Sequence, residues 1–190
     1  MVDVSIPEQV ELQKPVLTPQ WRVLRFFLSI IDPRAYLHAF RLLNHYNQTH
    51  VIPRRALEIG ANSAISPTSQ FANPSRIQIG ERAHIGAGCF LWAGPKSGHI
   101  EVGDDLLLGP NVMITAANYR FRDGAPVTKQ AMSESSVRIG NNVWIGTGAI
   151  VLPGSNIASH AVIAAGSVVR GHVGTGEVFA GVPARNVRPK

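Results

Sequence analysis

The chain has 190 residues, of which 45% are hydrophobic, and its 18 Gly and 13 Pro are scattered rather than concentrated in a linker. This length and composition exclude a disordered tail and indicate one domain, with room for a small appendage. The net charge of +6 favours an anionic partner. No basic run reaches five residues and no aromatic series alternates with Arg or Lys, so no nucleic-acid partner is expected.

The single cysteine, Cys89, excludes an intrachain disulfide and fits a reducing compartment. No Cys/His cluster has the spacing of a structural zinc site, and the first ten residues lack the basic start and apolar core of a secretion signal. The longest apolar stretch, residues 23–31, contains Arg25 and is too short to span a bilayer. These features predict a cytoplasmic protein, with the inner face of the membrane as the alternative location.

Two short helices are predicted near the N-terminus, because Thr18-Pro19 and Asp32-Pro33 each place a capping side chain before Pro in a first turn. We expect residues 1–55 to form a helical cap over the first part of the domain that follows. The face expected to cover it consists of Tyr36, Phe40 and Leu43. The alternative is contact with an anionic membrane that carries lipid-linked sugars, through Trp21, Arg22, Arg25, Phe26 and Phe27.

From residue 59 onward, an aliphatic or aromatic residue recurs every six positions and is usually followed by Gly. The period holds in five sets of three: Ile59, Ile65 and Phe71; Ile79, Ile85 and Leu91; Val102, Leu108 and Ile114; Ile139, Ile145 and Val151; Ile157, Ile163 and Val169. Side chains alternate along a strand, so this period indicates short strands broken by tight turns. Glycines able to adopt positive φ are expected at the turns, namely Gly60, Gly80, Gly86, Gly103, Gly109, Gly140 and Gly146.

Each set predicts the three sides of one triangular coil of roughly eighteen residues. Stacked coils pair their strands in parallel, so the aliphatic ladder becomes one continuous interior. Small residues suit the crowded inward positions: Ala83, Cys89, Ala149, Ser155, Ala161 and Ser167. We therefore predict an all-β fold over residues 56–190, a parallel β-helix of about five coils in which Cys89 is a core residue.

Two insertions interrupt the period, at residues 92–101 and 115–136. Both follow the third side of a coil, the second of them after the third coil. They are thus expected to leave from the same corner of successive coils and to lie beside each other outside the helix. Loops held on a rigid scaffold commonly carry the chemistry of a site.

Residues 59–188 resemble the hexapeptide-repeat acetyltransferases, especially the maltose and galactoside acetyltransferases and the capsule or lipopolysaccharide O-acetyltransferases. The likeness is carried by NPSRIQIG, VGDDLLLGPNVMITAAN, VRIGNNVWIGTGAIVLPGSNI, VIAAGSVVR and AGVPARNVR. The resemblance implies a left-handed β-helix, a homotrimer with active sites between neighbouring helices, and acetyl-CoA as the donor. The basic net charge fits the phosphates of CoA.

The resemblance also implies roles for particular residues. Trp144 matches an aromatic wall beside the acceptor sugar or the pantetheine arm. Arg185 matches a basic residue near the adenosine phosphates, and Arg170 lies close to the family's Thr-Lys pair, although Gly171 replaces the Lys. The backbone and small side chains expected to border the CoA thiol arm are those of Gly146, Thr147, Ala165, Gly166 and Ser167.

One position departs from the family pattern. The loop after the third coil normally reads Asn-His, and the His acts as general base, but here it reads Asn118-Tyr119. A neutral phenol is a poor base near pH 7. His99, in the neighbouring insertion, could supply the imidazole instead. Alternatively, Tyr119 orients the amine of a nucleotide-linked amino sugar, which needs little help from a base, or transfer is lost and the chain is a scaffold or binding protein.

The γ-type carbonic anhydrases share the repeat but bind zinc through three His. Only His84 and His99 lie near the corresponding coils, so no metal site is expected. We interpret the chain as an acetyl-CoA-dependent transferase that acetylates a sugar hydroxyl of a surface polysaccharide or its precursor. The expected catalytic residues are His99, Asn118 and Tyr119.

Overall fold

The computed structural model describes residues 18–187 of the chain. Residues 1–17 of the predicted cap, and Arg188 at the end of the last family motif, lie outside the described residues. The chain divides into two compact units, Met1–Leu43 and Asn44–Lys190.

Two helices occupy the described start of the chain, α1 (Pro19–Ile31) and α2 (Pro33–Tyr46), as the two Pro positions predict. Asp32 caps α2, because its Oδ1 accepts a hydrogen bond from the backbone N–H of Arg34 at 2.9 Å. The side chain of Thr18, in contrast, makes no capping bond. Neither helix has a buried residue, and the described residues contain no helix long and apolar enough to cross a membrane.

The second unit begins with a π-helical turn, η1 (Asn47–Val51), and the short helix α3 (Ile52–Arg55). Here the Tyr46 hydroxyl donates to the carbonyl of Pro67 at 3.0 Å, and Arg54 donates to the carbonyl of Ser66. His50 is buried and stacks on the Tyr46 ring, with 4.3 Å between centroids. We expected the helical cap to contact the first coil, and within the cap residues 46–54 make this contact.

The predicted covering face on α2 is exposed. Tyr36, Phe40 and Leu43 retain 59%, 74% and 66% of their accessible surface. The cap role of residues 1–43 stays a prediction.

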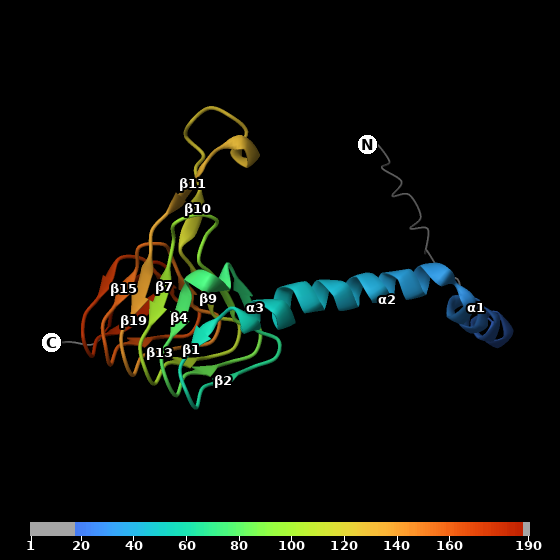
Figure 1. The fold of residues 1–190 in the computed structure, drawn as a ribbon, viewed down its shortest axis with the longest axis horizontal. Coiled ribbons are helices and arrows are strands. Elements are labelled where there is room, and N and C mark those ends of the chain that lie inside the picture. The colour runs from blue at the N-terminus through green and yellow to red at the C-terminus, as the bar shows by residue number, and fades with distance from the viewer. Residues whose placement is uncertain (1–17, 188–190) are drawn as a thin grey trace, which may run out of the picture. The chain divides into compact units, whose positions relative to one another are not determined.

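Residues 58–181 form a parallel β-helix of short strands, as the period of six predicts (Figure 1). Its successive coils consist of β1 (Glu58–Ile59), β2 (Ala64–Ile65) and β3 (Gln70–Ala72); β4 (Ile77–Ile79), β5 (His84–Ile85) and β6 (Phe90–Trp92); β7 (Ile100–Val102), β8 (Leu107–Leu108) and β9 (Met113–Thr115); β12 (Val137–Ile139), β13 (Trp144–Ile145) and β14 (Ile150–Val151); β15 (Asn156–Ile157), β16 (Val162–Ile163) and β17 (Val168–Val169); and β18 (His172–Val173) with β19 (Val178–Gly181). A 3-10 turn, η2 (Pro74–Arg76), precedes β4.

Strands one coil apart pair in parallel and build three faces. The first face is β1-β4-β7-β12-β15-β18, the second is β2-β5-β8-β13-β16-β19, and the third is β3-β6-β9-β14-β17. The final strand β20 (Ala184–Asn186) folds back antiparallel on β19. The chain therefore makes a sixth, partial turn beyond the five sets read from the sequence.

The interior consists of the predicted aliphatic ladder. Ile79, Val102 and Ile139 are directly paired across neighbouring coils and are buried. Ile59 and Ile65 of the first coil are more exposed. The small inward residues predicted from the sequence are all buried, including Cys89, and burial raises the pKa of its thiol.

The corner glycines are at the predicted positions but for a different reason. Positive φ is adopted two residues after them, for example at Asn62, Asn111 and Asn142. The glycines themselves make room for the next coil: a Cβ on Gly146 would lie 2.5 Å from the backbone nitrogen of Ala165. Real Cβ atoms essentially never approach this closely, so the glycine column allows the coils to stack.

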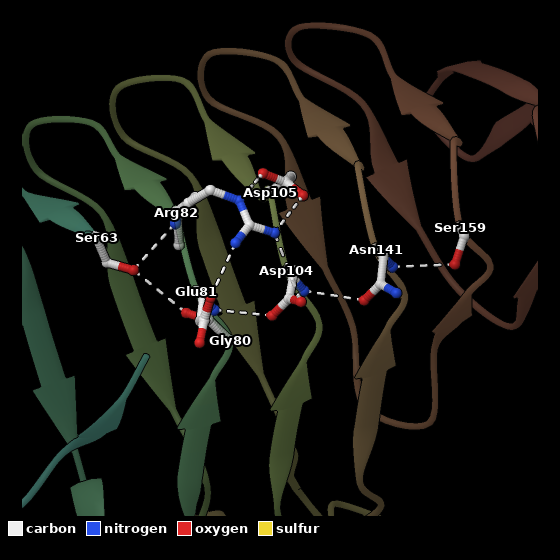
Figure 2. A network of polar contacts seen from close by, with 9 residues as sticks. Ser63, Gly80, Glu81, Arg82, Asp104, Asp105, Asn141 and Ser159 are labelled. Atoms are coloured by element: carbon white, nitrogen blue, oxygen red, sulfur yellow. Dashed lines mark hydrogen bonds and ion pairs between the residues drawn. The ribbon is translucent and has the colours of Figure 1, made fainter. Parts of the chain in front are cut away.

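A ladder of side chains joins the corners between the first and second faces (Figure 2). Ser159 Oγ accepts the N–H of Asn141, Asn141 Oδ1 accepts that of Asp104, and Asp104 Oδ1 accepts that of Glu81, at 2.8–3.0 Å. Arg82 donates to both carboxylate oxygens of Asp105. The ladder satisfies backbone groups that the tight corners leave without strand partners.

Candidate active site

The two insertions leave the helix at the corner between the third and first faces, as predicted. The first spans residues 93–99, between β6 and β7. The second contains a hairpin of β10 (Ala117–Tyr119) and β11 (Met132–Glu134), with a 3-10 turn η3 (Val127–Lys129) near its tip. In Figure 1 this hairpin projects away from the coils.

One carboxylate joins the two insertions. Glu134 Oε2 accepts the backbone N–H groups of Ser97 at 2.6 Å and Gly98 at 2.7 Å, and the N–H of Lys96 lies 3.1 Å from Oε1. Burial acts to raise the pKa of Glu134, but the three N–H donors outweigh it, and the net pKa lies below the ordinary value for Glu. The carboxylate is therefore ionised at neutral pH.

His99 is exposed at the end of the first insertion. Its Nδ1 lies 2.9 Å from the carbonyl oxygen of Ser97, and its backbone N–H donates to Ser136 Oγ at 3.2 Å. A carbonyl oxygen can only accept, so Nδ1 must carry the proton in this contact. In the neutral ring Nε2 then holds the lone pair, as a general base requires.

Asn118 and Tyr119 lie on β10 and are exposed. They line an open hollow of about 300 Å³ on the hairpin, formed by residues 118–123 and Ser133. The guanidinium of Arg122 lies over the ring of Phe121 at 5.3 Å. Tyr119 pairs with Met132, two positions further out along the hairpin than Glu134. The hollow thus combines two Arg, one Asp and two aromatic side chains.

A second group of predicted residues lies around the second face. Trp144 is 53% exposed on β13 and pairs with Leu107 and Val162. The corner after β13 stacks against the corner after β16, where the N–H of Gly166 donates to the carbonyl of Thr147 at 2.9 Å. Gly146, Thr147, Ala165 and Gly166 therefore form one ridge. The Ser167 side chain instead points inward, where its hydroxyl accepts the N–H of Gly181 at 3.1 Å.

The two predicted basic residues are separated. Arg170 lies in the turn between β17 and β18, at the same corner as the insertions. Arg185 is exposed on β20, beside the end of the second face, and pairs with Ala180. Within one chain, the candidate acid-base residues and Arg170 therefore occupy one corner, while Trp144, the ridge and Arg185 lie elsewhere.

Comparison with known proteins identifies the repeat. The family of the bacterial transferase hexapeptide (six repeats) matches residues 136–171, and the hexapeptide repeat of succinyl-transferase matches residues 76–116. A galactoside O-acetyltransferase of Lactococcus lactis is 33% identical over 162 residues, which cover 76% of this chain and 73% of the relative. The chain belongs to the hexapeptide-repeat acetyltransferases.

Two further comparisons support this assignment. The galactoside O-acetyltransferase of Escherichia coli is 27% identical over 183 residues, covering 90% of this chain and 88% of the relative. The solved structure of a galactoside acetyltransferase in complex with coenzyme A has a TM-score of 0.63 and 27% identity, covering 82% of this chain and 80% of the other.

Glu134 and Arg76 are the residues of this hexapeptide-repeat acetyltransferase that sequence reasoning missed. Arg76 donates through Nε to the carbonyl of Gly98 at 3.1 Å and through Nη2 to the carbonyl of Gly94. Arg76 lies outside both insertions, and Glu134 is one of several polar residues of the second insertion, so neither carries a signal in the sequence. Each contact becomes visible only when successive coils are stacked. Among residues 18–187, no three His, Cys, Asp or Glu side chains lie close enough together to hold a metal ion.

Proposed function

We propose that this protein transfers the acetyl group of acetyl-CoA to a hydroxyl of a sugar in a surface polysaccharide or its precursor. The observation that carries the proposal is the contact of the exposed His99 imidazole with the Ser97 carbonyl, which places the proton of the neutral ring on Nδ1 and leaves the lone pair on Nε2. Two relatives of this chain are named galactoside O-acetyltransferases, and the structure of a galactoside acetyltransferase was solved in complex with coenzyme A.

In the proposed reaction His99 Nε2 removes the proton of the acceptor hydroxyl as the oxygen attacks the thioester carbonyl carbon. A C–O bond forms and the carbonyl becomes a tetrahedral oxyanion. When the intermediate collapses, the C–S bond breaks and the thiolate of CoA takes the proton from the imidazolium. The products are the O-acetyl sugar and CoA, and His99 returns to its starting state.

The acceptor is proposed to occupy the hollow of residues 118–123, with Asn118 and Tyr119 orienting it by hydrogen bonds. The donor is proposed to run along the ridge of Gly146, Thr147, Ala165 and Gly166 toward Arg185. Ser167 could contact CoA only through its backbone, since its side chain is buried. Arg170, at the insertion corner, is available for a phosphate.

These two groups of residues lie on different parts of one chain, and a homotrimer would bring them together across a subunit boundary. Trp144 and Leu107 are exposed and lie at paired positions of neighbouring strands on the second face, which suits such an interface. Light scattering in solution checks this proposal: a trimer supports the shared site, and a monomer that turns over substrate contradicts it.

We also propose a cytoplasmic location with the helices α1 and α2 resting on the inner membrane face, where lipid-linked sugar precursors are assembled. The support is the exposed apolar surface of both helices together with their four Arg, whereas the single acidic residue of this region, Asp32, lies between the helices. Such a pairing of apolar and basic residues suits an anionic bilayer surface.

The reaction is tested by following CoA release and acetylated product over a panel of sugars and nucleotide sugars. We expect His99→Ala to lower kcat by about 100-fold or more while the affinity for acetyl-CoA is unchanged. His84→Ala, which removes another exposed imidazole on β5, is the matched control and should retain full activity. Full turnover by His99→Ala would reject this residue as the base.

N-acetylation of an amino sugar is the alternative acceptor chemistry. A neutral amine needs little base assistance, so on that acceptor Tyr119→Phe would be more damaging than His99→Ala. The same panel separates the two: product retained after hydroxylamine treatment is an amide, and product that is cleaved is an ester.

A further inference from the structure

The loop that carries His99 is held from both sides by opposite charges. On the side of the second coil, Arg76 donates to the carbonyls of Gly94 and Gly98. On the side of the hairpin, Glu134 accepts the loop N–H groups of Lys96, Ser97 and Gly98. One cation thus binds the loop's carbonyl groups and one anion binds its amide groups.

We propose that Glu134 is a positioning residue, which fixes the tautomer and orientation of His99 by holding the Ser97 peptide in place. The inference rests on the proposed function, in which His99 is the general base. The connection is short: Glu134 binds the Ser97 N–H at 2.6 Å, and the carbonyl of the same residue accepts from His99 Nδ1 at 2.9 Å.

The ends of the loop are buried at Ala93, Gly94 and Gly98, whereas Lys96 and Ser97 between them are exposed. Gly94 has φ of +83°, and a Cβ there would lie 3.0 Å from Glu134 Oε2, so the loop and the carboxylate are closely packed. Exposed residues without apolar burial depend on their hydrogen bonds for a single conformation, and the hydrogen bonds of the Lys96 and Ser97 amides go to Glu134.

The same carboxylate ties the base to the acceptor hollow. Glu134 on β11 pairs with Ala117 on β10. Asn118 and Tyr119 follow Ala117 on β10. Because Glu134 belongs to the hairpin and binds the loop of residues 96–98, it links the segment that carries His99 to the hairpin that carries Asn118 and Tyr119. Displacement of a reacting group by about 1 Å can lower a rate about 100-fold.

Among residues 18–187, Glu134 forms no ion pair. The described ion pairs join other residues, for example Arg138 with Glu101 on the first face. All of the hydrogen bonds described for the Glu134 carboxylate come from the loop of residues 96–98. Removal of the carboxylate therefore acts on this loop first.

The test compares Glu134→Ala and Glu134→Gln in the full-length protein with Glu101→Gln, a matched control that removes another carboxylate from the neighbouring coil. The first readout is steady-state kinetics with the acceptor that the sugar panel identifies. The second is the imidazole ¹⁵N spectrum of histidine-labelled protein near pH 9. The His99 signals are assigned by their absence from the spectrum of His99→Ala. Circular dichroism and acetyl-CoA affinity show whether each variant is folded.

We expect His99 to be protonated at Nδ1 in the wild-type protein and in Glu101→Gln. In Glu134→Ala it should become a mixture of the two tautomers, with kcat lowered about 10-fold to 100-fold and the KM for acetyl-CoA unchanged. Glu134→Gln keeps one acceptor oxygen and should be affected less than Glu134→Ala. An unchanged His99 spectrum in a folded Glu134→Ala protein would overturn the proposal.

The two readouts distinguish this inference from the proposed function. If the tautomer changes in Glu134→Ala but His99→Ala retains full turnover, Glu134 positions His99 and the base assignment fails. If His99→Ala is inactive and the His99 tautomer is the same in Glu134→Ala as in the wild-type protein, the base assignment stands and the positioning role is wrong.

Discussion

At the scale of single residues, the corner glycines decide how closely the coils can stack. A Cβ on Gly146 would meet the backbone nitrogen of Ala165 at 2.5 Å, and one on Gly109 would meet the nitrogen of Thr147 at 2.6 Å. Backbone atoms of a neighbouring coil cannot move aside without breaking the parallel hydrogen bonds of both coils. These positions therefore exclude every side chain.

We predict that Gly146→Ala lowers the free energy of unfolding by about 1–3 kcal/mol, because a methyl group is forced against the next coil. The measurement is urea unfolding followed by circular dichroism. Gly148→Asn is the control: Gly148 has φ of +67° and open space around it, and Asn142 adopts a similar φ at another corner. Equal destabilisation by both variants would contradict the stacking explanation.

The period of six predicted the positions of these glycines, but we expected glycine there because it tolerates positive φ. A one-dimensional period identifies a corner, whereas the approach of one coil to the next is visible only after the coils are stacked. The same holds for the site. His99 could be proposed from its insertion, but its hydrogen bond to Ser97 and the role of Glu134 depend on distances that spacing does not contain.

At the scale of elements, α2 has two opposite faces. Arg34, His38, Arg41 and His45 recur at helical spacing on one side, and Tyr36, Phe40 and Leu43 on the other. The apolar residues are more than half exposed. An amphipathic helix of this kind binds an anionic bilayer by its apolar face, with the basic residues contributing about 1 kcal/mol each.

We predict that the protein floats with vesicles containing anionic phospholipid and not with neutral vesicles. The double variant Arg34→Ala, Arg41→Ala should bind about 10-fold or more weakly. The control is Arg120→Ala, Arg122→Ala, which removes the same charge from the hairpin. Two results would contradict a membrane contact and favour the cap. One is that the α2 variant binds anionic vesicles as strongly as the wild-type protein, and the other is that the wild-type protein binds anionic and neutral vesicles equally.

The strands were largely predictable from the period of six, because the aliphatic residue that each strand places in the interior recurs every six positions. The sixth turn was missed because its start breaks the period: Val169 and Val173, both buried, lie four positions apart instead of six. The hairpin β10–β11 also escaped prediction, because an antiparallel pair within an insertion has no aliphatic ladder to mark it.

At the scale of the whole molecule, the β-helix acts as a rigid frame that presents two separate groups of candidate residues. The insertion corner carries His99, Glu134 and the hollow, while the second face and its corner ridge carry Trp144 and Arg185. The separation within one chain is the structural reason to expect that a complete site needs a neighbouring copy.

Titration calorimetry of the purified protein with acetyl-CoA examines the donor without any knowledge of the acceptor. We expect saturable binding at one site per chain, with CoA binding at the same site. Absence of binding by a folded protein would contradict the acetyltransferase mechanism and leave a β-helix that serves as a scaffold.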